Sequence, residues 1–106
     1  MTSIYGIVYH MGKATLIFRD KQIDPGDGSI TEMVLWQTDE PVPGCKHRFK
    51  YRLFYGYPDR PLVRYDNERG KGDHRHLQGL EEPYGFRGEK QLIEDFLADR
   101  RRLGER

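Results

Sequence analysis

The residue types best suited to chemistry are concentrated in one segment, residues 64–76, which reads RYDNERGKGDHRH. Four basic residues, two histidines, three acids and one amide lie within its thirteen positions. Gly70 and Gly72 make this stretch compact enough for backbone amides to approach an anion. The segment is therefore the first candidate for a functional site.

A paired-histidine site is the chemistry that this segment suggests. His74 and His76 are two positions apart, so in a strand they point the same way. Two imidazoles on one face can serve as general acid and base, because their unperturbed pKa is about 6.5. Asp66 would orient one imidazole. The cations expected to stabilise charge on a phosphate are Arg64, Lys71 and Arg75. This arrangement suits metal-independent cleavage of an RNA backbone, with the 2′-hydroxyl as nucleophile.

Two other interpretations of the same residues stay open. The histidines and Asp66 can form a structural hydrogen-bond network that only fixes the loop. They can also hold a metal ion, with Asp66 or Asp73 as further ligands. The sequence supplies no convincing third and fourth ligand, however, and nearby cations disfavour a divalent ion. We therefore predict no metal and no cofactor.

A second feature is a basic ladder in the expected strand over residues 46–57. Alternate side chains of a strand point to opposite faces, so the aromatic face of this strand is expected to line the core. His47 shares that aromatic face and is expected to be a core histidine with satisfied hydrogen bonds. The outward ladder, expected to follow the backbone of a nucleic acid, is Lys46, Arg48, Lys50 and Arg52.

Length and charge favour one folded domain with a local basic patch. The chain has 106 residues and a net charge of +1, which is about the length of one domain. Residues 46–76 nevertheless carry nine basic and four acidic side chains, an excess that attracts phosphates or an acidic partner. A solvated charged face, balanced by its flanks, accounts for the same excess equally well.

The sequence also indicates a compartment. No apolar run approaches the roughly 20 residues that span a bilayer, and the start lacks the order of a signal peptide. The single cysteine, Cys45, cannot form an internal disulfide, which fits a reducing compartment. It lies in a proline-rich turn with no obvious neighbouring base, so we give it no role. We expect a cytoplasmic protein that does not contact a membrane.

These residues must be positioned by an α+β fold. We predict a four- to five-stranded antiparallel sheet with a C-terminal helix packed on one face. The helix is expected over residues 89–102, where an apolar stripe has the spacing of a helix lying on a sheet. Residues 1–12 are expected to be an N-terminal extension, with a single α+β domain over residues 13–106. The expected strands are residues 15–19, 30–37, 46–57, 62–67 and 74–77, with an irregular stretch at 79–88.

Five blocks of this chain, in order, resemble the TumE family of toxin–antitoxin proteins. The resemblance covers residues 13–99, and its most specific part is the block that runs from Tyr-Asp-Asn to His-Arg-His. The blocks are KATLIFRD at 13–20, KHRFKYRL at 46–53, RYDNERGKGDHRH at 64–76, EEPYGF at 81–86 and QLIEDFLAD at 91–99.

The resemblance implies a small bacterial or archaeal toxin, neutralised by a DNA-binding antitoxin encoded beside it. Many toxins of this size cleave messenger RNA or block translation, so the expected partners are the cognate antitoxin and RNA, and a homodimer stays open. The matching residues taken as the functional motif are Arg64, Tyr65, Asp66, Asn67, His74, His76, Glu82 and Tyr84. Of these we expect Tyr65, Asn67, Glu82 and Tyr84 to bind substrate. The alternative function is a non-catalytic module that binds a nucleic acid or a protein.

Overall fold

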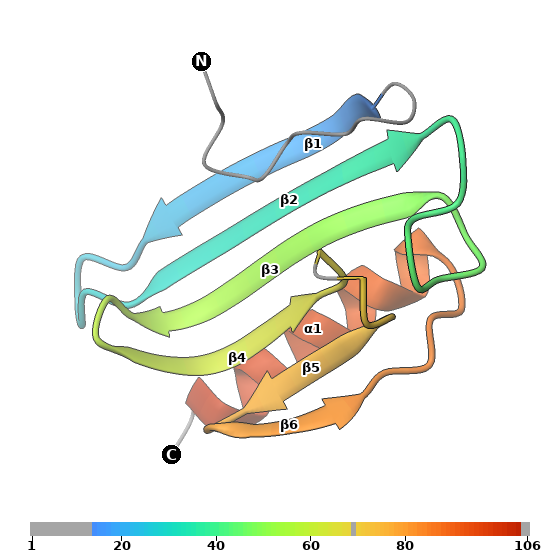
Figure 1. Cartoon of the computed structure of the whole chain (residues 1–106). Helices are drawn as coiled ribbons and strands as arrows, with labels where there is room; N and C mark the ends of the chain where they lie inside the picture. Colours follow the sequence, from blue (N-terminus) through green and yellow to red (C-terminus); the bar gives the residue numbers. More distant parts are fainter. Residues whose placement is uncertain (1–13, 69, 105–106) are drawn as a thin grey trace.

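The computed structural model describes residues 14–68 and 70–104 of the chain (Figure 1). It is an α+β fold in which a six-stranded antiparallel sheet packs against one C-terminal helix, so the predicted fold class is confirmed. The strands lie side by side in the order in which they occur in the sequence, each joined to the next by a short connection. The elements are β1 (Ala14–Ile23), β2 (Ile30–Thr38), β3 (Phe49–Tyr57), β4 (Arg60–Asp66), β5 (His74–Leu77), β6 (Leu80–Pro83) and α1 (Glu89–Gly104).

The sixth strand is a correction to the expected sheet. Strand β6 lies within the stretch that we expected to be irregular, and it forms a hairpin with β5. Gln78 and Gly79 connect the two strands with φ values of 50° and 91°, the conformation of a two-residue type I′ turn. Pro83 is tolerated because β6 is an edge strand of the described sheet, where a missing N–H does not break a ladder.

The strand boundaries also differ from the expected ones, most of all in β1 and β3. Strand β1 runs on to Ile23, and β3 begins at Phe49 rather than at residue 46. The residues before β3 belong to a loop, in which the Val42 amide donates to the His47 carbonyl. The expected extension over residues 1–12, and the possible edge strand at residues 4–9 within it, lie outside the described residues.

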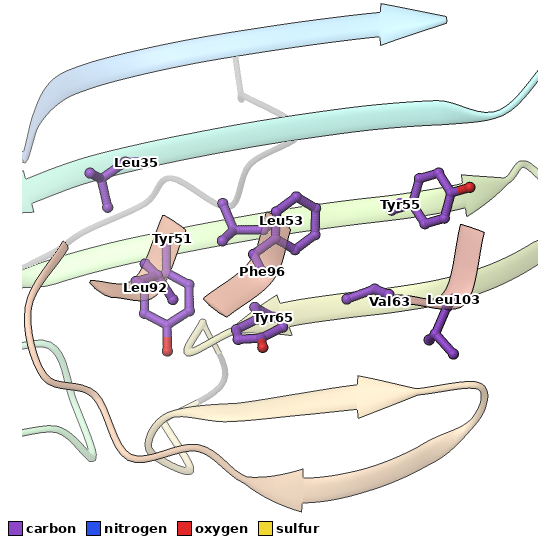
Figure 2. Close-up of a cluster of buried hydrophobic side chains, with 9 residues drawn as sticks. All are labelled: Leu35, Tyr51, Leu53, Tyr55, Val63, Tyr65, Leu92, Phe96 and Leu103. Atoms are coloured by element: carbon purple, nitrogen blue, oxygen red, sulfur yellow. The ribbon is translucent and has the colours of Figure 1, made fainter. Parts of the chain in front are cut away.

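The core forms where the aromatic face of β3 meets α1, as predicted. Leu92 and Phe96 of the helix are fully buried, and α1 packs against β3 and β4 (Figure 1). Tyr51 and Leu53, two positions apart on β3, point to this side because strand side chains alternate. Figure 2 shows the buried cluster, which comprises Leu35, Tyr51, Leu53, Tyr55, Val63, Tyr65, Leu92, Phe96 and Leu103.

The opposite side of the sheet, here called the far face, carries charged side chains. In the ladder, Arg52 of β3 lies opposite Asp66 of β4, which in turn lies opposite His74 of β5. In the neighbouring row, Arg64 of β4 lies opposite His76 of β5. Arg64 and Asp66 therefore share the far face with the basic residues of β3. No helix among the described residues is long and apolar enough to cross a membrane.

Candidate functional site

The two histidines of β5 lie together on the far face, as their spacing predicts. Their ring centroids are 5.4 Å apart and the ring planes meet at 79°. Across the β4–β5 ladder, Asp66 faces His74 and Arg64 faces His76. The structure therefore brings together all four residues that the sequence analysis took as catalytic.

Hydrogen bonds fix the orientation of His74, whose side chain is 7% exposed. Its Nε2 lies 3.0 Å from Oδ1 of Asp66. Its Nδ1 lies 3.2 Å from the carbonyl oxygen of Gly72. A carbonyl can only accept a hydrogen bond, so Nδ1 carries a proton. Nε2 faces the Asp66 carboxylate, which can accept a hydrogen bond from this nitrogen.

His76 is held more loosely and is more accessible, with 22% of its side chain exposed. Its Nε2 lies 3.4 Å from Oε1 of Glu81. Its Nδ1 is buried, and no described residue offers it a hydrogen bond. The other carboxylate oxygen of Glu81 lies 3.7 Å from His74 Nε2 and 3.4 Å from Lys71 Nζ. Sequence reasoning missed Glu81, because only the β5–β6 hairpin places it opposite His76.

Two hollows flank the histidine pair. The larger has a volume of about 390 Å³ and is lined by His74, Glu81 and Lys71, among others. The smaller, of about 170 Å³, is lined by Arg64, Asp66 and other residues of β3 and β4. Each hollow thus contains one member of the Asp66–His74 pair and at least one cation.

The basic ladder differs from the expected exposed row. Lys50 is 4% exposed, and its Nζ lies 3.7 Å from Oε2 of Glu68. Burial lowers the pKa of Lys50, and Glu68 partly offsets this effect. Arg52 lies 4.0 Å from Glu32, so counter-charges on neighbouring segments separate the like charges. The two exposed members, Lys46 and Arg48, lie in the loop before β3.

Four expected substrate-binding residues lie on the α1 side of the sheet, away from the histidine pair. Arg75 alternates with the histidines on β5, and its Nη1 donates to Asp99 of α1 at 2.9 Å. The Tyr65 hydroxyl donates to the same carboxylate oxygen at 2.5 Å. The structure therefore does not bring Arg75 to the phosphate position expected for it beside Arg64. The four residues are Tyr65, Arg75, Glu82 and Tyr84.

Asn67 is fully buried and binds the protein's own backbone. Its Oδ1 accepts from the Tyr51 amide at 3.1 Å, and its Nδ2 donates to the Phe49 carbonyl at 2.8 Å. The side-chain amide thus extends the pairing of β3 beyond the end of β4. This position differs from the expected contact with substrate, since the side chain is not exposed to one.

A second polar cluster, which the sequence analysis missed, comprises Cys45, His47 and Asp73. One potential ligand atom from each lies within 4.8 Å of the others. The Phe49 amide donates to His47 Nδ1 at 3.1 Å, so the ring proton is on Nε2, 2.9 Å from Asp73. His47 thus has both nitrogens satisfied, as predicted. Cys45 does have neighbours, but burial and then Asp73 raise the pKa of its thiol to about 11.

Comparison with known proteins identifies the family. A family model described as toxin TumE matches residues 4–103, a range that starts within the segment expected to be an extension. Neither the search of curated proteins nor that of solved structures gave a significant match. The matched range spans the whole histidine site, α1 and nearly all of the chain. This chain therefore belongs to the TumE family of toxins, and a toxin of this kind has a cognate antitoxin.

Proposed function

We propose that this toxin acts on RNA as a metal-independent endoribonuclease in which His74 and His76 transfer the protons. The observation that carries the proposal is the placement of both imidazoles on one sheet face, 5.4 Å apart, with Asp66 bound to one of them. Two differently held histidines are what a reaction needs when one group must accept a proton and another must donate one.

The two environments suggest which histidine has which role. His76, the more exposed ring, would take the proton from the 2′-hydroxyl on its Nε2. The 2′-oxygen then attacks phosphorus and the bond from phosphorus to the 5′-oxygen breaks. His74, held as a proton donor by Gly72 and Asp66, would protonate the departing 5′-oxygen. The products are a 2′,3′-cyclic phosphate and a 5′-hydroxyl end.

Two cations are positioned to stabilise the phosphate. Arg64 is 39% exposed and lies opposite His76 in the ladder. Lys71 is 56% exposed and lines the same hollow as His74. Such cations act on the charge that develops on the phosphoryl oxygens. Lys46 and Arg48 are exposed in the loop that precedes β3. They would bind the RNA backbone farther from the histidine pair.

Incubation of the purified protein with a structured RNA, with and without EDTA, tests the proposal. We expect cleavage that survives EDTA and is lost in the variant with His74→Ala and His76→Ala. The matched control is His47→Gln, which alters a histidine of the other polar cluster and should still cleave. Circular dichroism and thermal melting must show that each variant folds. Cleavage by the folded double variant would refute the assignment.

A second readout comes from the toxin's effect on cells. In a strain that lacks the antitoxin, the wild-type toxin should inhibit growth and the double histidine variant should not. If growth inhibition is unchanged in that variant, the histidines are not the source of toxicity. RNA binding that weakens with salt, without any product, would instead favour the non-catalytic binding module.

A further inference from the structure

We propose that Asp66, His74 and His76 form a binding site for Zn²⁺, with Glu81 as the fourth ligand. Three potential ligand atoms, one each from Asp66, His74 and His76, lie within 4.8 Å of one another. They come from two adjacent strands, so the backbone ladder fixes the positions from which they project. Two imidazoles and two carboxylates are a ligand set that suits zinc.

The distances between these atoms are close to those of a tetrahedral zinc site. With bonds of about 2.0–2.1 Å to nitrogen and oxygen, neighbouring ligand atoms lie about 3.3 Å apart. Here Asp66 Oδ1 lies 3.0 Å from His74 Nε2. Of the two oxygens of Glu81, Oε2 lies 3.7 Å from His74 Nε2 and Oε1 lies 3.4 Å from His76 Nε2. The Glu81 side chain, which is 42% exposed, would turn so that one of these oxygens faces the ion.

The proton on His74 Nδ1 orients the ring for metal binding. A zinc-bound imidazole usually donates its other ring N–H to a carbonyl or carboxylate, which fixes the tautomer. The contact of 3.2 Å from His74 Nδ1 to the Gly72 carbonyl has this form. This contact turns Nε2 of His74 toward the Asp66 carboxylate. A proton or a metal ion can lie between these two atoms.

The second cluster of the protein lacks this feature, although its composition is similar. In His47 the ring nitrogen away from the cluster accepts a hydrogen bond from the Phe49 amide. The remaining ring nitrogen must then carry the proton, which it donates to Asp73. Because a protonated nitrogen has no lone pair for a metal, the Cys45–His47–Asp73 cluster serves as an internal control.

The charges around the proposed site are compatible with a divalent ion. Asp66 and Glu81 supply two negative charges. Two cations lie near these carboxylates: Arg64 is 3.9 Å from Asp66 Oδ2, the oxygen that does not face His74, and Lys71 is 3.4 Å from Glu81 Oε2. Both cations are more than one-third exposed, so they can turn toward solvent when the ion enters.

Zinc at this position would inhibit the toxin, a consequence that rests on the proposed function. The ion would bind the Nε2 atoms of both imidazoles. In the proposed mechanism these are the atoms that accept and donate the protons. The same histidine pair would therefore catalyse cleavage when no metal is bound and be inhibited when zinc is bound. Metal binding itself does not depend on the protein being a ribonuclease.

Titration of the purified toxin with Co²⁺, without RNA, tests the site. Tetrahedral Co²⁺ absorbs visible light, and we expect one equivalent to bind and Zn²⁺ to displace it. His76→Ala should weaken binding by at least about tenfold, the lower end of what losing even an outer partner costs. Cys45→Ser is the matched control and should bind as the wild type does. His76→Ala is preferred to His74→Ala because His76 is less buried.

The outcomes separate the two proposals. Absence of stoichiometric binding, or binding that survives His76→Ala and is lost in Cys45→Ser, would overturn the metal site. Loss of RNA cleavage on adding Zn²⁺, restored by EDTA, would support inhibition. If the wild type binds Co²⁺ but never cleaves RNA, the metal site stands and the proposed function fails.

Discussion

Replacing Asn67 by alanine distinguishes a structural role from a substrate-binding role for this residue. The side chain is fully buried and satisfies two backbone groups of β3, the Tyr51 N–H and the Phe49 carbonyl. Asn67→Ala would leave both without their partner. Each buried group left unpaired costs about 1–3 kcal/mol, so for the two groups together we expect the free energy of unfolding to fall by about 2–6 kcal/mol.

That loss is large for a chain of this size. Small domains have about 5–15 kcal/mol of stability in total, and each kcal/mol shifts the Tm of such a domain by about 4–8 °C. Asn67→Ala should therefore lower Tm by at least about 8 °C. Asn67→Asp should be at least as destabilising, because a carboxylate oxygen would replace the Nδ2 donor. That oxygen would face the Phe49 carbonyl at 2.8 Å and Asp73 Oδ1 at 3.4 Å.

Urea denaturation followed by circular dichroism measures this change. An m-value equal to that of the wild type would show that the folded and unfolded states of the two proteins are comparable. The control is Gln22→Ala, which removes an exposed amide of β1 and should change stability by less than about 0.5 kcal/mol. Cleavage by Asn67→Ala should persist at temperatures where the variant is folded. A variant of nearly wild-type stability that no longer cleaves RNA would refute our reasoning and favour contact with substrate.

Two further predictions concern the loops that support the histidine pair. Because burial raises the pKa of Cys45 to about 11, only about one thiol in a thousand is thiolate at pH 8. Its alkylation by iodoacetamide should therefore be slow there and rise about tenfold per pH unit up to pH 10, whereas rapid labelling at neutral pH would contradict the buried position. A Cβ at Gly44 would lie 2.4 Å from the Gly70 carbonyl oxygen, and the φ of +85° is unfavourable to other residues, so Gly44→Ala should cost more than about 1 kcal/mol in urea denaturation. Gly85→Ala, where a Cβ meets no atom within 4 Å, is its control, and equal stability of the two variants would argue against the close loop contact.

The α1 side of the sheet accounts for the motif residues that do not contact the histidine pair. Arg75 joins β5 to the helix through Asp99, and Glu82 of β6 accepts from the same guanidinium at 2.5 Å. Tyr84 donates to Asp95 of α1 at 2.5 Å. These bonds attach the β5–β6 hairpin to α1. The motif thus contains residues that form the site and residues that hold its strand in place.

The sequence by itself determined the helix, five of the six strands and the faces of the sheet. Alternation in residues 46–53 separates basic from aromatic and apolar side chains, and an alternating strand can bury only one of these sets. The same period of two placed His74 and His76 on one face. The helix followed from the spacing of Leu92 and Phe96. Local pattern sufficed in these cases because neighbouring residues alone set the direction of each side chain.

Only the tertiary structure decided which residues meet across the sheet. Glu81 faces His76 because of a two-residue turn at Gln78 and Gly79, and a one-residue change in that register would have turned Glu81 to the other face. The same is true of burial: Lys50 looks exposed by alternation, but Glu68 reaches it from the loop after β4. Contacts between segments distant in the chain depend on strand register and loop path, which local patterns do not encode.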